Sequence, residues 1–143
     1  MRYRIINGVA TADIAYEVYG ETLKEIFENA AWAVTQTMVE PATIHSIQNF
    51  KFQIADSQID DLLFDFLNEL IFLKDARQML FSRFGIKLTK LDAGRYRLDA
   101  NFWGEKIDIK KHKLKCDVKA VTRHKFFLKK AKGKYITQIV LDI

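Results

Sequence analysis

The chain of 143 residues has little of what marks secreted or membrane proteins. It has one cysteine, Cys116, so no internal disulfide can form and a reducing compartment is expected. No apolar run approaches the roughly 20 residues that a membrane-spanning helix needs. Residues 1–6 are too short and too charged for a signal sequence. We therefore expect a soluble, cytoplasmic protein.

Proline and glycine are also scarce, with one and six residues respectively, and they are scattered along the chain. No linker, internal repeat or low-complexity tract marks a domain boundary. The apolar content of 49% is enough for one hydrophobic core. The sequence therefore predicts a single domain over residues 1–143. Glycine-rich phosphate loops of the P-loop or dinucleotide-binding type are absent as well.

The net charge of +5 conceals a strong asymmetry. Residues 106–134 hold twelve lysine and arginine residues against Asp108 and Asp117 alone, a net charge of +10, so the rest of the chain carries −5. Such a segment could attract nucleic acid or an acidic partner, or it could be an ordinary solvated lysine face.

The apolar periodicity predicts two helices. Thr22 and Glu25 form a capping box ahead of an apolar stripe that runs to Met38, before Pro41. Ser57 and Asp60 suggest a second capping box, followed by a wide apolar stripe to Leu70. Alternating residues predict strands at 13–19, 47–54, 84–89, 96–102, 118–128 and 135–141. The order indicates an α+β fold with two helices packed on one mixed, largely antiparallel sheet.

The carboxylates at the end of the sequence form a candidate metal site. Asp142 has a side-chain carboxylate, and Ile143 contributes an α-carboxylate where the sequence ends. Asp13 opens a predicted strand and would complete an oxygen cluster if that strand pairs beside the last one. Oxygen ligands suit calcium or magnesium better than zinc. The alternative is that all three carboxylates are simply solvated.

Other candidate sites carry weaker signals. His112, Cys116 and His124 are suitable zinc ligands by type, but they lack the tight spacing of zinc sites. A nucleophilic Cys116 is equally unsupported, because on a strand it would share the face of Val118 and be packed. Lys119 would lie on the opposite face, where its ammonium could bind a carboxylate or a phosphate. The alternative is that Lys119 is an ordinary exposed lysine.

Several fragments together resemble the archease family. They occur in the family's order along the chain: Thr11-Ala12-Asp13-Ile14 with Gly20, the helix from Leu62 to Leu70 with Asn68-Glu69, Gly104-Glu105 with Asp108 and His112, Val118-Lys119-Ala120-Val121-Thr122 with His124, and Asp142-Ile143. The resemblance implies a non-catalytic accessory protein that activates an RNA-splicing ligase of the RtcB type. In that family the accessory protein promotes guanylylation of the ligase by GTP and manganese, and supports multiple turnover.

The resemblance also assigns residues. The family's metal ligands fall on Asp13, Asp142 and Ile143, which favours a metal over simple solvation of these groups. The metal expected is calcium, with magnesium or manganese as alternatives. Asp65, Lys119 and His112 match motif positions and are expected to contact the partner or support the site.

Three positions depart from the family pattern. Ala10 stands where the family commonly has histidine, which removes a donor beside Asp13 and could weaken metal binding or activation. Phe66 replaces tryptophan and keeps the apolar bulk, and Arg123 replaces an aromatic residue and adds to the basic segment.

Two other function classes remain open in the sequence. The first is a nucleic-acid-binding module in which residues 106–134 contact RNA directly, with no role for DNA or a membrane. The second is a small enzyme with Asp65 and His112 as acid and base, for which no substrate pocket can be inferred.

Overall fold

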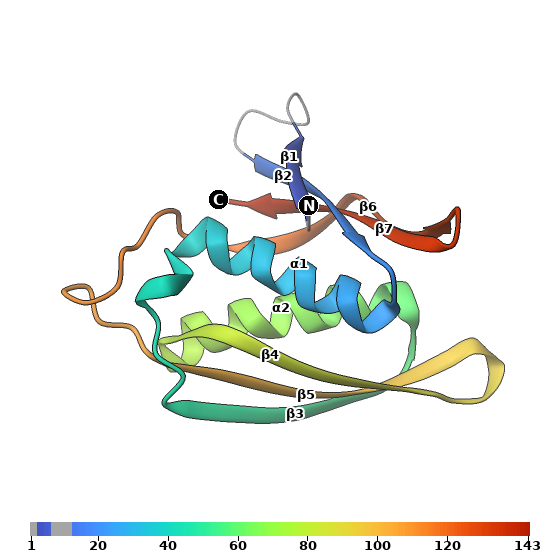
Figure 1. Cartoon of the computed structure of the whole chain (residues 1–143), viewed down its shortest axis with the longest axis horizontal. Helices are drawn as coiled ribbons and strands as arrows, with labels where there is room; N and C mark the ends of the chain where they lie inside the picture. Colours follow the sequence, from blue (N-terminus) through green and yellow to red (C-terminus); the bar gives the residue numbers. More distant parts are fainter. Residues whose placement is uncertain (1–2, 7–12) are drawn as a thin grey trace.

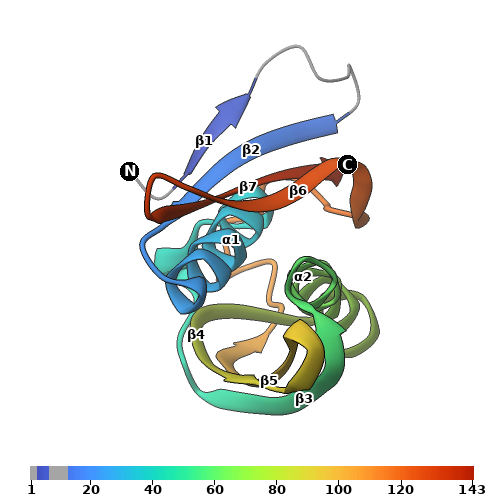
Figure 2. The same cartoon turned by 90° about the vertical axis from the view of Figure 1, so that its right-hand side faces the viewer.

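The computed structural model describes residues 3–6 and 13–143, with the side chains of residues 56 and 57 left aside. Two helices lie between two sheets, so the molecule has three layers (Figures 1 and 2). The elements in chain order are β1 (Tyr3–Ile6), β2 (Asp13–Gly20), α1 (Leu23–Met38), β3 (Gln48–Gln58), α2 (Ile59–Arg77), β4 (Met79–Lys90), β5 (Arg95–Lys106), β6 (Ala120–Ala131) and β7 (Lys134–Asp142).

Every strand pairing is antiparallel, and the strands form two sheets. One sheet has the order β1-β2-β7-β6 and the other the order β3-β5-β4. The predicted α+β class with two helices on antiparallel strands is confirmed, but the single mixed sheet is wrong. Alternation of side chains identifies a strand and its faces, and it does not say which strands pair.

Helix α1 begins as the sequence predicts. The Thr22 hydroxyl accepts a hydrogen bond from the Glu25 N–H at 3.1 Å, and the Glu25 carboxylate accepts one from the Glu21 N–H. Its apolar stripe packs against β2 and β7 on one side and β4 on the other. Because the helix lies between two sheets, ten of its residues are buried.

Helix α2 is also present, and its predicted capping box depends on the side chain of Ser57, which lies outside what the structure describes. Gln58 occupies the N-cap position and makes no side-chain capping hydrogen bond. Asp60 instead accepts a hydrogen bond from the Asp61 N–H within the first turn. The helix ends at Gln78, which has the left-handed backbone typical of a C-cap (φ 55°). None of the helices among the described residues is long and apolar enough to cross a membrane.

The predicted strands are all found, most of them longer than expected, and the sequence analysis missed β1. The turn at Asp92–Gly94 joins β4 to β5 as predicted. Close packing between these two strands requires Gly104, because a Cβ atom there would lie 1.8 Å from the Leu80 carbonyl oxygen. Residues 107–119 form a long irregular segment between β5 and β6, and they include the predicted strand residues Val118 and Lys119.

Candidate functional site

The first residue of β2 and the last residue of β7 lie directly opposite each other. Asp13 pairs with Asp142 in the antiparallel register of these two central strands. Their neighbours Ile14 and Leu141 pack against the core, so the two aspartates share the outward face of the sheet. The predicted convergence of the first acidic strand and the last one is confirmed for these two residues.

The two carboxylates have no internal counter-charge in the part of the chain that the structure describes. Neither Asp13 nor Asp142 accepts a side-chain hydrogen bond or forms an ion pair with residues 3–6 or 13–143. Like charges directly opposite on paired strands repel each other. A hard cation between them would relieve this repulsion, and carboxylate oxygens are its preferred ligands.

A third oxygen donor would come from Ile143, which follows Asp142 directly and packs its side chain partly against the core. The donor set of two aspartates and an α-carboxylate therefore fits a divalent cation in chemistry. Among the described side chains, no group of three His, Cys, Asp or Glu residues is arranged to hold a metal ion. The cluster is thus incomplete without the main-chain carboxylate or further oxygens.

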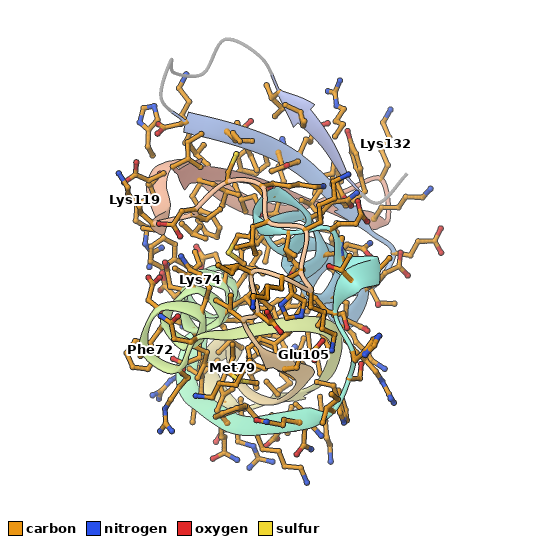
Figure 3. The ribbon with its side chains drawn as sticks, turned by 90° about the vertical axis from the view of Figure 1, so that its left-hand side faces the viewer. Phe72, Lys74, Met79, Glu105, Lys119 and Lys132 are labelled. Carbon is orange, nitrogen blue, oxygen red and sulfur yellow. The ribbon has the colours of Figure 1, made fainter. Side chains whose placement is uncertain are left out.

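Lys119 lies at the same end of this sheet. Its backbone N–H donates to the Asp142 carbonyl oxygen at 2.7 Å, and the next residue, Ala120, pairs with Asp142 in the β6–β7 register. The Lys119 side chain is exposed. Figure 3 shows Lys119 beside the end of this sheet, well apart from Lys132 in the β6–β7 hairpin.

Asp65 belongs to a different surface, the exposed side of α2. This helix packs against β6 from the inner side of the sheet, whereas Asp13 and Asp142 face outward. Partial burial raises the pKa of Asp65, and the nearby Arg123 opposes that shift. Arg123 itself stacks 3.9 Å from the Phe64 ring centroid and pairs with Asp61 at 2.9 Å.

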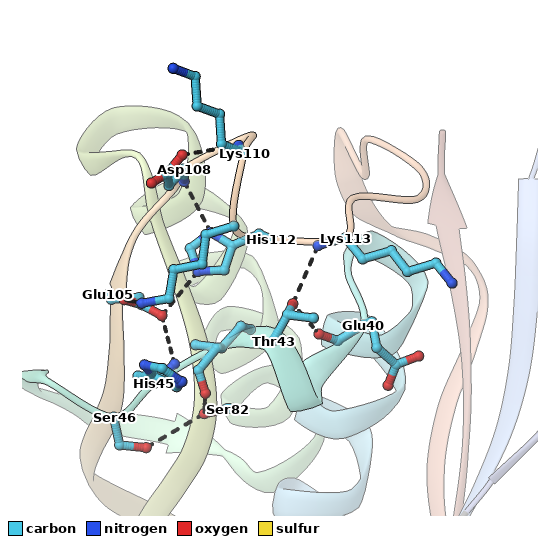
Figure 4. A network of polar contacts seen from close by, with 12 residues as sticks. Glu40, Thr43, His45, Ser46, Ser82, Glu105, Asp108, Lys110, His112 and Lys113 are labelled. Carbon is cyan, nitrogen blue, oxygen red and sulfur yellow. Dashed lines mark hydrogen bonds and ion pairs between the residues drawn. The ribbon is translucent and has the colours of Figure 1, made fainter.

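His112 is buried, with 4% of its surface exposed, so it cannot contact a partner directly. Its Nδ1 accepts the Asp108 N–H at 2.9 Å, which leaves the proton on Nε2, facing Glu105 Oε2 at 3.0 Å (Figure 4). His112 therefore supports residues 107–119. An acid–base role with Asp65 has no support, because His112 is enclosed in this network and Asp65 lies on α2.

Glu105 is the centre of that network, and the sequence analysis assigned it no role. It is 6% exposed and accepts hydrogen bonds from the His45 N–H at 2.6 Å and from Lys111 Nζ at 2.5 Å. Burial alone would raise the pKa of Glu105, but the hydrogen bonds from His45, Lys111 and His112 outweigh it and lower the pKa to about 2. Side-chain alternation in the sequence places Glu105 on one face of a strand, and this pattern does not predict a buried carboxylate with three hydrogen-bond donors.

Two residues of α2, Lys74 and Asn68, bind residues 117–121 and hold them against the core. The sequence analysis assigned neither of them a role. The ammonium of Lys74 is buried and contacts Asp117 at 2.5 Å, Asp75 at 2.8 Å and the Val118 carbonyl oxygen at 2.7 Å. The Asn68 side chain pairs with both the N–H and the carbonyl of Val121, as a neighbouring strand would. Together they hold the start of β6, and with it Lys119, against the helix.

Cys116 is exposed in the irregular segment, so the prediction that it is packed on a strand is wrong. His124 is exposed and His112 is buried, and no metal-binding group contains them among the described residues. Zinc ligation by these three residues is therefore not supported.

Comparison with known proteins identifies the family. The model of the Archease protein family matches residues 3–143. The chain belongs to the archease family. It is similar to Protein archease of Pyrococcus furiosus, with 35% identity over 134 residues that cover 93% of this chain and 94% of the relative.

Two solved structures have a similar fold. The solution structure of protein 1598 from Methanobacterium thermoautotrophicum is 30% identical and aligns with a TM-score of 0.85 over 99% of both chains. An archease from Thermotoga maritima, described as a possible chaperone, is 22% identical and aligns with a TM-score of 0.63, covering 94% of this chain and 93% of its own. The second similarity concerns the fold alone.

Two of the three departures from the family pattern can be located. Phe66 is fully buried and contacts Phe27, Phe52 and Phe102 ring to ring, so the aromatic bulk is kept. Arg123 lies on the surface over Phe64. Ala10 is outside the described residues.

Proposed function

We propose that this archease is a non-catalytic, metal-binding activator of a GTP-dependent RNA-splicing ligase of the RtcB type. It promotes guanylylation of the ligase and restores it for further turnovers in tRNA splicing and RNA repair. Asp13, Asp142 and the α-carboxylate of Ile143 hold a divalent cation, with calcium expected and magnesium or manganese as alternatives.

The observation that carries this proposal is the register of β2 and β7. It brings Asp13 and Asp142 together on an outward face, where a bound cation would be open to a partner. Two facing carboxylates without internal hydrogen-bond donors destabilise the strand pair, so a purely structural role does not explain them. Lys119 at the same sheet end adds an exposed ammonium that can meet a carboxylate or phosphate of the ligase.

The alternative of a single basic RNA-binding segment over residues 106–134 has less geometric support. Figure 1 shows residues 107–119 at one end of the molecule and the β6–β7 hairpin at the other. Some of its cations are also engaged, since Lys111 pairs with Glu105 and Arg123 pairs with Asp61. The net charge of +10 is therefore divided over separate surfaces.

The test is ligase guanylylation at a limiting concentration of this protein. Asp142→Asn removes one charge and keeps the shape, and one residue added after Ile143 converts the α-carboxylate to an amide. Each change should reduce the rate of guanylylation about 10- to 100-fold, which is the scale of losses at supporting groups of metal sites.

Glu17→Gln is the matched control. Glu17 lies on the same strand and the same face as Asp13, but it is neutralised by Arg4 at 3.0 Å. Its loss should leave activation unchanged. Full activation by the Asp142 variant and by the extended chain would rule out the metal role, and failure of wild-type protein to accelerate guanylylation would rule out the ligase role.

A further inference from the structure

The sheet β3-β5-β4 has one face on the helices and one face that no described element covers (Figure 2). Side chains tipped with nitrogen project from this outward face (Figure 3). We call it the outer platform and define it by the register of the three strands: Asn49, Lys51 and Gln53 from β3, Arg97, Asp99, Asn101 and Trp103 from β5, and Arg83, Gly85, Lys87 and Thr89 from β4.

A stacked pair of Trp103 and Arg83 lies at one end of the outer platform. The guanidinium carbon of Arg83 lies 4.4 Å from the centroid of the Trp103 ring. The ring also lies close above Gly85, where a Cβ atom would come within 3.0 Å of it. Trp103 therefore lies flat on the sheet, and Arg83 presents a second planar group above it. Flat aromatic rings and guanidinium planes are the surfaces on which unpaired bases stack.

The charge of the outer platform is positive. Four cations, Lys51, Arg83, Lys87 and Arg97, share the face with one anion, Asp99. Asp99 is already engaged by Gln53 at 2.8 Å and by Arg97 at 3.4 Å. Lys51 and Lys87 are exposed and flank β5 on opposite sides, so they can reach the phosphates of a strand that crosses the sheet.

A hollow of about 390 Å³ lies over β3 and β5 in the middle of the outer platform, with Lys51, Gln53, Asp99 and Asn101 among the residues lining it. Amide and carboxylate groups of this kind can hydrogen-bond the edges of unpaired bases. No leucine, isoleucine, valine or methionine is among the residues that define the outer platform. The core of a stable protein interface is richer in apolar side chains, so a nucleic acid fits this face better than a protein does.

We propose that the outer platform binds single-stranded nucleic acid, with a base stacked on the outer side of the Arg83 guanidinium above Trp103 and phosphates held by Lys51 and Lys87. This site is separate from the Asp13 and Asp142 pair, and it uses none of residues 106–134. It stands independently of the ligase proposal.

The binding test uses a fluorescein-labelled oligouridylate of about 12 nucleotides, within the usual range of single-domain sites. Fluorescence anisotropy would compare wild type with Lys51→Glu/Lys87→Glu. The control, Lys130→Glu/Lys132→Glu in the β6–β7 hairpin, changes the net charge equally. The platform variant should bind at least about tenfold more weakly, with a shallower salt dependence, while the control keeps most of its affinity.

A second readout tests stacking itself. The chain has two tryptophans, and Trp32 packs edge-on against Phe84 on the helix side. In Trp32→Phe the remaining fluorescence comes from Trp103, and it should be quenched when the oligonucleotide binds. In Trp103→Phe binding should weaken and the fluorescence of Trp32 should not change. Thermal unfolding of each variant separates loss of the site from loss of the fold.

An oligodeoxythymidylate of the same length and a double-stranded RNA complete the experiment. Tighter binding of one single strand identifies RNA or DNA as the natural ligand. The proposal is overturned if the wild type does not bind at low salt, or if it binds the duplex as tightly as the single strand. It is also overturned if the two charge variants lose affinity equally, or if only the hairpin variant loses affinity. Trp103 fluorescence that is not quenched on binding would contradict it as well.

Discussion

The molecule holds carboxylates in two contrasting ways. Glu105 is buried, and its oxygens accept hydrogen bonds from a backbone N–H, a lysine and a histidine. Asp13 and Asp142 face each other at the end of a sheet, and neither has a donor among the described residues. The first carboxylate is satisfied within the fold and stabilises it. The Asp13 and Asp142 carboxylates are not satisfied by any described residue.

Removing the Glu105 carboxylate should have the largest effect on the free energy of unfolding. Glu105→Ala leaves the His45 N–H, Lys111 and His112 without their acceptor, and such losses at buried ion pairs cost about 3–5 kcal/mol. Urea unfolding of the variant should show a midpoint lowered with an unchanged slope. A change below about 1 kcal/mol would mean that the network contributes little to the fold.

The pH dependence of the free energy of unfolding should also show the contribution of Glu105. The pKa of Glu105 is about 2 in the folded state, below its ordinary value of 4.5. Its contribution is therefore complete above about pH 5 and is lost as the pH falls from there toward 2, with a total of roughly 3 kcal/mol. The measurement is the difference between wild type and Glu105→Gln in urea unfolding at several pH values. A difference that stays constant over this range would contradict the assignment.

The two classes of carboxylate were not equally visible in the sequence. Asp13 and Asp142 could be suspected because they sit at the ends of alternating segments, and the family resemblance placed them together. The capping of α1 and the stripe of α2 follow from local periodicity, so these were predicted correctly. Lys74 and Asn68 bind carbonyl groups that are 44 and 53 residues away, and Glu105 links His45 to the irregular segment that holds Lys111 and His112. No local pattern in the sequence encodes these contacts. The division of the strands into two sheets was missed for the same reason.

Metal binding should stabilise the protein through the unsatisfied pair alone. A cation that binds only the folded state adds about 2.7 kcal/mol when its concentration is a hundred times the Kd. Calcium should therefore raise the unfolding midpoint of wild type and of Glu17→Gln, and it should not raise that of Asp142→Asn. The same series with magnesium and manganese ranks the metals. An equal response of all three proteins would place the cation elsewhere.

The smallest effect expected is that of Asp142→Asn in the presence of a chelator. Without a cation, Asp13 and Asp142 repel each other across the strand pair, so removal of one charge should be neutral or should stabilise the fold by about 0.2–1 kcal/mol. Glu105→Gln under the same conditions should destabilise it, although the chemical change is comparable. Urea unfolding in chelator measures both. If Asp142→Asn were as destabilising as Glu105→Gln, then Asp142 would already have an internal partner, and the case for an external cation would fail.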